Sequence, residues 1–394
     1  MSDTHFHIEP MKKELPSKVK NIGWALLFVG IVIYAIGYTV NPREAAFNNI
    51  IGFLFITSIA VGSIFLIALE YIAGAVWSVP MRRVNEFLGG LILIAPIVAV
   101  PMFFHLHDIF HWTDLGAVGT DELLKGKQPY LNLNFFIIRF VVVFALWNLF
   151  YWLFTRNSLK QDLSKDQMLT TINIRLAAVF LPVFAITLTV TAVDWAMSLE
   201  PHWFSTILGV YYFAGTVLAA VATATYIIVK FHENGYLQNL KRDHFYSLGA
   251  LLFAFINFWA YIAFSQFLLI WYANLPEETI WFMKRWEGGM QFVSVLLIIV
   301  HFAVPYFLLL PQEAKMNLKR LKFMAIWILF AHLFDLYWLV MPTYANGVTI
   351  GWMEIGFPAL IIGLIIVVLG YKMKRHNLMP VGDPKLERGL KFRL

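Results

Sequence analysis

The chain has 394 residues, of which 60% are hydrophobic and 14% are charged, and its net charge is +6. A soluble domain is usually about 45–50% apolar and about 25% charged, so the composition excludes a soluble globular protein and indicates an integral membrane protein. The chain has no cysteine. This excludes disulfides, covalently attached c-type haem and iron–sulfur clusters held by cysteines of this chain.

Ten apolar runs, bounded by charged residues, proline or glycine, predict ten transmembrane helices, because a bilayer core needs roughly 20 apolar residues per helix. The runs are 22–39, 49–77, 84–104, 134–154, 174–195, 205–230, 245–272, 288–310, 322–341 and 350–371. The predicted fold class is therefore an all-α polytopic membrane protein with a membrane domain of residues 22–371. A transmembrane barrel would show shorter segments of alternating hydrophobicity.

Lysine and arginine lie mostly on one side of the predicted helices. Of the 30 basic residues, 24 fall in the segments on the side of the two termini, and 6 fall on the other side, counting Arg139 just inside the fourth run. Basic loops mark the cytoplasmic side. We therefore expect a multi-pass protein of the bacterial inner membrane, with the N-terminal segment 1–21 and the C-terminal tail 372–394 in the cytoplasm. Charge in short segments next to the membrane argues against nucleic-acid binding.

The polar N-terminal segment has no cleavage pattern of a secretory signal. At the other end of the sequence, the basic segment 382–394 is expected to be mobile or held by a partner.

Weak internal similarity suggests a repeat. Three pairs of segments match in the same order, namely Phe47–Gly52 with Phe204–Gly209, Leu88–Leu91 with Leu248–Leu251, and Arg139–Val141 with Gln291–Val293. Copies that are four helices apart have the same orientation, so this pattern predicts two parallel four-helix bundles, about 47–197 and 204–342, with two flanking helices. The alternative is chance matching among Phe, Ile, Leu and Gly.

Several ionisable residues fall inside the apolar runs, where such groups are costly and often functional. By depth, Glu70 and His301 suit a route from the cytoplasm. His332 and Asp335, on one helical face at i, i+3, suit a route from outside. Asp194 and Arg139 belong to the same outer set. The full set of candidate proton-path residues is Glu70, His301, His332, Asp335, Asp194 and Arg139. The alternative is that they form structural pairs, for example Arg139 with Asp194.

Haem and metal sites are not expected in this chain. Only His301 and His332 lie well inside the predicted helices, and a b-type haem needs axial histidines paired across a bundle. His105, His107, Asp108 and His111 have the spacing of metal ligands, but they lie at an outer helix end, where surface polarity or contact with a partner is the preferred interpretation. No residue is assigned as catalytic or as a metal ligand.

Two stretches on the predicted outer side, Asp194–Ile207 and Phe264–Phe282, are long and unusual. With the ten helices, they resemble a membrane subunit of bacterial alternative complex III, a quinol:cytochrome c oxidoreductase. The similarity is to its polysulfide-reductase-type (NrfD-like) subunits, and within these to the smaller one, quinone-binding subunit 2. The resemblance implies a multihaem cytochrome c, an iron–sulfur subunit and a sister membrane subunit as partners, which would carry the haem c and the iron–sulfur clusters.

The resemblance also implies that a quinol can bind in this family, although the sister subunit is the better candidate for quinol oxidation. We therefore expect a non-haem membrane subunit of a respiratory quinol:cytochrome c, or oxidase-linked, oxidoreductase, which contributes a proton path and is not catalytic alone.

Two other functions fit the same sequence. A secondary transporter would have broken helices at matched positions of the two halves, and Pro96 and Pro101 in the third run have no counterparts in the seventh. A passive membrane anchor for redox subunits would have all of its buried polar groups in satisfied structural pairs, with no water-accessible route.

Overall fold

The structure is a computed structural model that describes residues 11–394, so the first ten residues of the predicted segment 1–21 lie outside the described part. Within residues 11–394, ten helical segments are long and apolar enough to cross a membrane, and no residue lies in a β-strand. The predicted all-α polytopic class is confirmed.

Eight of the ten spans are continuous helices and two are interrupted. The continuous ones are α1 (Ser17–Val40), α2 (Pro42–Ala73), α8 (Leu133–Ser164), α9 (Met168–Trp195), α10 (Leu208–Glu233), α11 (Arg242–Ala273), α15 (Leu318–Tyr344) and α16 (Trp352–Arg375). The third span consists of η1 (Val79–Met81), α3 (Arg82–Gly89), η2 (Gly90–Leu93) and α4 (Ala95–Phe103), and the eighth of α13 (Met290–Ile298), η5 (Ile299–Ala303) and α14 (Val304–Leu309).

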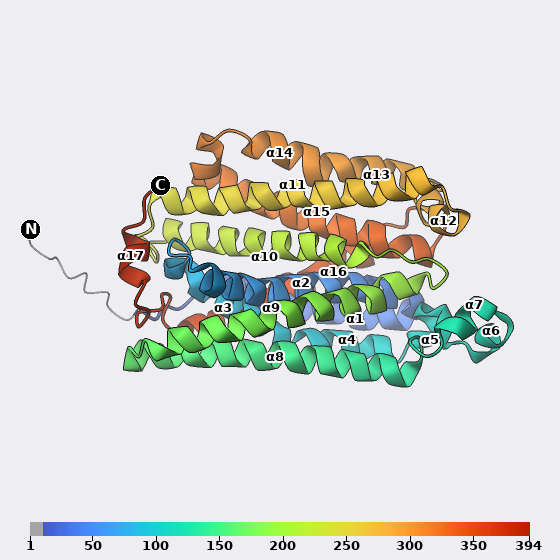
Figure 1. The fold of residues 1–394 in the computed structure, drawn as a ribbon, viewed down its shortest axis with the longest axis horizontal. Helices are drawn as coiled ribbons and strands as arrows, with labels where there is room; N and C mark the ends of the chain where they lie inside the picture. Colours follow the sequence, from blue (N-terminus) through green and yellow to red (C-terminus); the bar gives the residue numbers. More distant parts are fainter. Residues whose placement is uncertain (1–10) are drawn as a thin grey trace, which may run out of the picture.

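Short helices lie between the spans and after the last one, at both ends of the molecule. They are α5 (Leu106–Ile109), η3 (His111–Thr113), α6 (Leu115–Thr120), α7 (Glu122–Lys127), η4 (Met197–Leu199), α12 (Pro276–Lys284), η6 (Glu313–Met316) and α17 (Leu386–Leu390). We call the end that carries α17 and the C-terminus the terminal end, and the end that carries α5–α7 and α12 the distal end (Figure 1).

The spans form two four-helix bundles with a shared central contact (Figure 1). In the first bundle, α2 packs against α9 and the broken third span, and α8 packs against α9. In the second, α10 packs against α11 and α15, and both of these contact the broken eighth span. Helix α2 joins the bundles by packing against α10 and α15, and the pair α1–α16 flanks α2. In an apolar stretch of 18 residues, 94% of the residues of α2 and 89% of those of α10 are buried, whereas 17% of those of the flanking helix α1 are buried.

Capping residues explain where α2 differs from the predicted run 49–77. Asn41 caps the helix by accepting a hydrogen bond from the Glu44 N–H at 3.2 Å, and Pro42 occupies the first turn, where its missing N–H is no loss. Gly74 ends the helix with φ +65°, a left-handed conformation that glycine adopts without a Cβ penalty. The helix therefore begins and ends earlier than hydropathy indicated.

Helix α8 continues ten residues beyond the predicted run 134–154. Its extension contains Arg156 and Lys160, which mark the edge of the apolar region but are good helix formers. It ends at Lys165, which has φ +52°. Hydropathy locates the part of a helix that lies in the bilayer, and α8 projects beyond that part.

The C-terminal tail is held by this chain itself, and the expectation that residues 382–394 are mobile or held by a partner is wrong. Leu378, Leu386 and Leu390 are 1%, 2% and 4% exposed. Helix α17 packs against η1. The basic composition suggested a solvated tail, but its leucines recur at helical spacing and bury one face against the terminal end.

Glycines allow α1 and α16 to pack at backbone distance, as small residues commonly do between transmembrane helices. A Cβ atom added at Gly30 would lie 2.5 Å from the Cα of Leu360, and one added at Gly363 would lie 2.5 Å from the backbone nitrogen of Leu27. The two helices contact each other closely along their length.

We expect Gly30→Val to lower the stability of the protein by about 1–3 kcal/mol, because the added side chain has to separate the two backbones. Thermal unfolding of the purified protein in detergent measures this as a lower Tm. Gly52→Ala is the matched control, since its Cβ would make an ordinary 3.4 Å contact with Ile361. Equal Tm values for the two variants would contradict the close α1–α16 packing.

Candidate functional site

Three ionisable side chains meet in the interior of the second bundle. His301 comes from η5, and His332 and Asp335 come from one face of α15. One ligand atom of each lies within 4.8 Å of those of the other two, and the residues are 1%, 1% and 2% exposed. We call these three residues the His–His–Asp cluster.

A π-helical turn positions His301. Residues Ile299–Ala303 of η5 interrupt the eighth span between α13 and α14. A single π-helical turn inside an α-helix is rare and is frequently found at functional sites. The imidazole of His301 stacks on the Trp259 ring of α11, with ring centroids 3.7 Å apart and an interplanar angle of 20°. The interrupted eighth span therefore positions His301 beside the face of α15 that carries His332 and Asp335.

Neutral donors hold the Asp335 carboxylate. The Tyr211 hydroxyl donates a hydrogen bond to Oδ1, and the indole N–H of Trp259 donates to Oδ2 at 3.1 Å. No lysine or arginine of residues 11–394 forms an ion pair with Asp335, although most other buried carboxylates have such a partner. A carboxyl group in this environment has no fixed counter-ion, so a proton is the natural neutralising charge.

The imidazoles have unused hydrogen-bonding capacity. His332 Nε2 lies 3.2 Å from the Ser58 Oγ of α2, while His332 Nδ1 and both ring nitrogens of His301 have no protein partner. Buried polar atoms usually have a partner, which can be an ordered water. These unpaired nitrogens depart from the satisfied pairs that a passive anchor predicts, whereas the burial of Glu70 and Asp335, which are 6% and 2% exposed, agrees with its lack of a water-accessible route.

Two imidazoles and a carboxylate are also ligand types for zinc or non-haem iron. With metal–ligand bonds of about 2.1 Å, tetrahedral ligand atoms lie about 3.4 Å apart. The partners of one water, hydrogen-bonded at about 2.8 Å, lie about 4.6 Å apart. The ligand atoms of the cluster lie within 4.8 Å of one another, which leaves room for either arrangement, and the proposal below treats the cluster as a site for water and protons.

Gly215 of α10 limits the space beside His332. A Cβ atom added at Gly215 would lie 2.7 Å from Cε1 and 2.9 Å from Nδ1 of that imidazole. Gly215 could not be identified from the sequence, because nothing local distinguishes it from the other small residues of α10.

Glu70 lies in a separate network at the terminal end, and not beside His301. Its carboxylate is 2.9 Å from Nη1 of Arg82, whose Nη2 is 2.7 Å from Asp383. Glu70 is twelve residues after Ser58 on α2, or about 18 Å of helix away from the contact with His332. The sequence grouped Glu70 with His301 only because the two residues have a similar predicted depth. It gave no sign of the partners Arg82 and Asp383, because their contact joins residues that are 301 positions apart.

Arg139 and Asp194 form a structural pair in the first bundle, which is the alternative that the sequence left open. Arg139 Nε donates to Asp194 Oδ2 at 2.8 Å, and the guanidinium lies 3.8 Å from the ring centroid of Tyr130. The Tyr130 hydroxyl also donates to Asp194 at 3.1 Å. Burial and the neighbouring carboxylate raise the pKa of Tyr130, so it remains a neutral donor to this pair.

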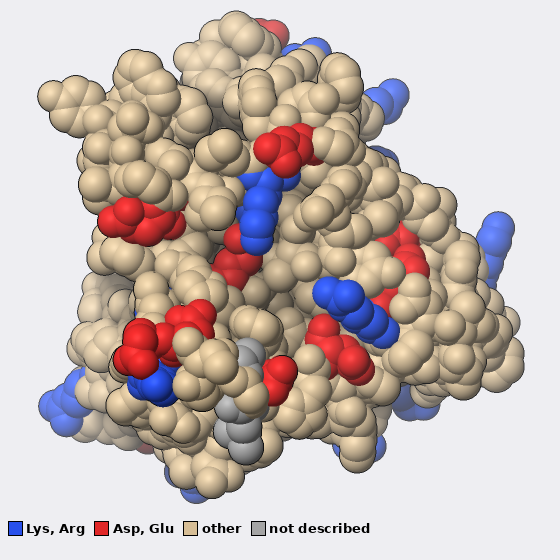
Figure 2. Space-filling model, turned by 90° about the vertical axis from the view of Figure 1, so that its right-hand side faces the viewer, with Lys and Arg blue, Asp and Glu red and all other residues tan. Residues whose placement is uncertain are grey.

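At the distal end, the histidine-rich segment lies at the surface. His105 Nδ1 is 3.1 Å from Asp108, and His107 and His111 line a shallow hollow with Arg43. Figure 2 views this end and shows scattered acidic groups with few lysines and arginines.

The two stretches that carry the family resemblance contact each other at the distal end. The rings of Trp203 and Trp281 stack with centroids 4.5 Å apart and an interplanar angle of 11°. Glu200, in the first stretch, forms an ion pair with Lys284 at 2.9 Å, just after the second stretch. The two stretches are therefore in direct contact at the distal end.

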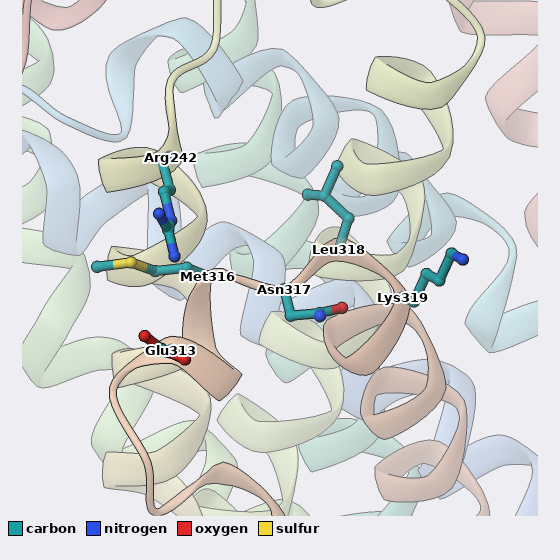
Figure 3. A pocket seen from close by; sticks show the side chains of 6 residues that line it. All are labelled: Arg242, Glu313, Met316, Asn317, Leu318 and Lys319. Atoms are coloured by element: carbon teal, nitrogen blue, oxygen red, sulfur yellow. The ribbon is translucent and has the colours of Figure 1, made fainter.

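Another hollow lies at the terminal end, between the start of α11 and the loop before α15 (Figure 3). Arg242 and Glu313 approach it from two chain segments, and Asn317 caps α15 by accepting from the Arg320 N–H at 3.1 Å. The hollow is open to solvent and contains none of the residues of the His–His–Asp cluster.

No protein-family model matches this chain, and no curated protein matches it. The fold and the site define it as a ten-span all-α membrane protein with a buried His–His–Asp cluster. A more specific function has to be argued from the chemistry of that cluster.

We expect Arg139→Ala to destabilise the protein by about 3–5 kcal/mol, because it leaves the Asp194 carboxylate buried and unpaired. Arg156→Ala, which removes an exposed arginine from the same helix, is the control. Thermal unfolding in detergent compares the two variants, and a loss no larger for Arg139→Ala than for Arg156→Ala would contradict the structural role of the pair.

Gly215→Ala should displace the imidazole of His332 and destabilise the protein by about 1–3 kcal/mol through overpacking. The same change at Gly52, where the added methyl group has room, should have little effect. A crystal or cryo-EM structure of the Gly215→Ala variant checks the imidazole position directly, and an unmoved His332 would contradict this packing.

Proposed function

We propose that this chain is a non-haem membrane subunit of a respiratory quinol:cytochrome c, or oxidase-linked, oxidoreductase, and that it contributes a proton path through its second bundle. The observation that supports this proposal most strongly is the His–His–Asp cluster. It places three groups that can exchange protons inside a membrane-spanning bundle, without a fixed counter-ion on Asp335.

Carboxylates and imidazoles are the side chains that bind and release protons most readily near neutral pH when their surroundings change. In this cluster, His301 offers two free ring nitrogens and His332 offers one. One bound water within reach of all three residues would join them into a continuous hydrogen-bonded set. Such a set passes a proton by short transfers and needs no large movement of the helices.

Hydroxyl groups extend this set from His332 into the contact between the two bundles. Ser58 of α2 lies 3.2 Å from His332 Nε2, 3.2 Å from the Tyr212 hydroxyl and 3.3 Å from the Thr216 hydroxyl of α10. Glu70 lies farther along the same helix α2, toward the terminal end. We propose that Glu70 serves the terminal-end half of the path, and that Asp335, His332 and His301 serve its centre.

Arg139 and Asp194 are left out of the proposed path. Arg139 and Asp194 are each other's charged partner at 2.8 Å, and the Tyr130 hydroxyl donates a further hydrogen bond to Asp194. Their role in this proposal is to stabilise the distal end of the first bundle.

The proposal assigns the redox cofactors to partners. This chain has no cysteine for iron–sulfur clusters or c-type haem, and its two intramembrane histidines contact Trp259 and Ser58. The partners would be a multihaem cytochrome c, an iron–sulfur subunit and a sister membrane subunit, with the first two at the distal end. A quinol could bind at the interface with the sister subunit.

The charge distribution supports the proposed orientation. The connecting and terminal segments on the side of the two termini carry 24 of the 30 lysines and arginines, as the cytoplasmic side of a bacterial inner-membrane protein does. We propose that the terminal end faces the cytoplasm, and that both termini lie there.

The secondary transporter receives less support. Its broken spans should occupy matched positions of the two halves. The third and eighth spans are the broken ones, whereas a four-span repeat pairs the third with the seventh, and the seventh, α11, is continuous.

Asp335→Asn tests the proposed function in the complex purified from native membranes and reconstituted into vesicles. We expect proton-coupled turnover to fall by roughly 100-fold or more, because a positioned proton carrier contributes at least that factor, while the complex still assembles. Glu313→Gln, a change at an exposed carboxylate of η6, is the matched control. Wild-type proton translocation in Asp335→Asn, His301→Gln and His332→Gln alike would overturn the proposal.

A further inference from the structure

The last nineteen residues, 376–394, cross the terminal end and contact both bundles. We call this segment the C-terminal strap. It follows α16 directly, and its Leu378 N–H donates to the Met11 carbonyl at 3.0 Å. In Figure 1 it lies across the terminal end, where its helix α17 runs beside the ends of the spans.

Backbone and side-chain contacts hold the strap on the first bundle. Asp383 accepts a hydrogen bond from Arg82 Nη2 at 2.7 Å, and the Gly382 N–H donates to Asp162 at 3.3 Å. A Cβ atom added at Gly382 would lie 1.9 Å from the carbonyl oxygen of Gln161. The backbone of the strap at Gly382 therefore packs directly against the backbone of α8, which indicates a closely packed segment rather than a loosely attached tail.

A second set of contacts holds the strap on the second bundle. Nε2 of His244, near the start of α11, lies 2.9 Å from the Gly389 carbonyl, and the Phe392 ring packs on the same imidazole at 5.7 Å between centroids. His244 is 0% exposed, and these strap contacts contribute to its burial. One short segment thus joins the ends of two bundles that otherwise meet through α2, α10 and α15.

Arg82 connects the strap to Glu70. Its guanidinium lies between Asp383 and Glu70 and is also 3.4 Å from Glu86. Glu70 and Asp383 are each 6% exposed. The strap therefore closes the surface beneath which the terminal-end carboxylate of the proposed path lies.

The charges of this network permit release of the strap. If Asp383 moves away, Arg82 keeps two carboxylate partners, Glu70 and Glu86, and neither bundle is left with an isolated buried charge. Release then breaks the Asp383–Arg82 contact and two hydrogen bonds of the strap backbone, and it exposes the apolar side chains of Leu386 and Leu390. A segment with these properties can open locally while the spans remain folded.

We propose that the C-terminal strap is a seal that closes access from the terminal end to Glu70, and that its local release admits water to this carboxylate. The importance of the seal for proton movement rests on the function proposed above. The seal itself is a property of the fold and is tested separately, by accessibility.

The chain has no native cysteine, so a single introduced cysteine reports accessibility without background. Ile67→Cys places a thiol one helical turn from Glu70, on the same face of α2, at a position that is 1% exposed. A membrane-impermeant thiol reagent is added to either side of vesicles that contain the complex, and the labelling rate is measured.

Two changes weaken the strap in this background. Leu386→Ala with Leu390→Ala removes its apolar anchors, and Asp383→Asn removes its charge contact with Arg82. We expect each to speed labelling at least about tenfold from the terminal-end side only, since loss of buried leucine contacts, or of one charge of the buried Arg82–Asp383 pair, shifts a local opening equilibrium by more than that factor. Lys391→Ala, in an exposed pair with Glu387, is the matched control and should leave the rate unchanged.

Unchanged labelling in both strap variants would overturn the seal, as would rapid labelling of Ile67→Cys in the otherwise unaltered chain or faster labelling from the distal side. Asp383→Asn removes no apolar contact and keeps the test decisive if the double leucine variant fails to assemble. Faster labelling with unchanged proton translocation would support the seal and contradict the role proposed for Glu70.

Discussion

The packing of α2 against α10 is the contact on which the rest of the structure depends. A Cβ atom added at Gly62 of α2 would lie 2.7 Å from the carbonyl oxygen of Thr216, so the two helices approach at backbone distance, as small residues permit in membranes. This approach brings Ser58 within reach of Tyr212, Thr216 and His332. Without it, the two bundles would share no polar contact in their interior.

The protein stabilises buried charge in three different ways. Arg139 and Asp194 form a closed ion pair, and Glu70 lies in a network in which Arg82 has three carboxylate partners. Asp335 instead receives hydrogen bonds from Tyr211 and the indole of Trp259. Ionisable groups inside a membrane are costly unless they are neutralised. Asp335 has no cationic partner among residues 11–394, so a bound proton is the charge that can neutralise its carboxylate. This property makes Asp335 the centre of the proposed proton path.

Sequence reasoning predicted the spans, the pairing of His332 with Asp335 on one helical face, and the option of an Arg139–Asp194 pair. These follow from local hydropathy and helical periodicity, or from opposite charges at similar depth. The position of His301 could not be predicted, because it depends on the π-helical turn of η5, which gives no signal in the hydropathy pattern. The Arg82–Asp383 contact spans 301 positions, and no local pattern identifies such partners. The C-terminal tail was predicted to be mobile or held by a partner because it is rich in basic residues. The helical spacing of Leu386 and Leu390, which bury one face of α17, was the signal for packing.

The central claim is that Asp335 exchanges a proton while the complex turns over. Infrared difference spectroscopy of the complex, reduced against oxidised, tests this claim most directly. We predict a carboxyl C=O band that changes with redox state, shifts in deuterated water and disappears in Asp335→Asn. Identical difference spectra for the wild-type complex and Asp335→Asn would contradict the account.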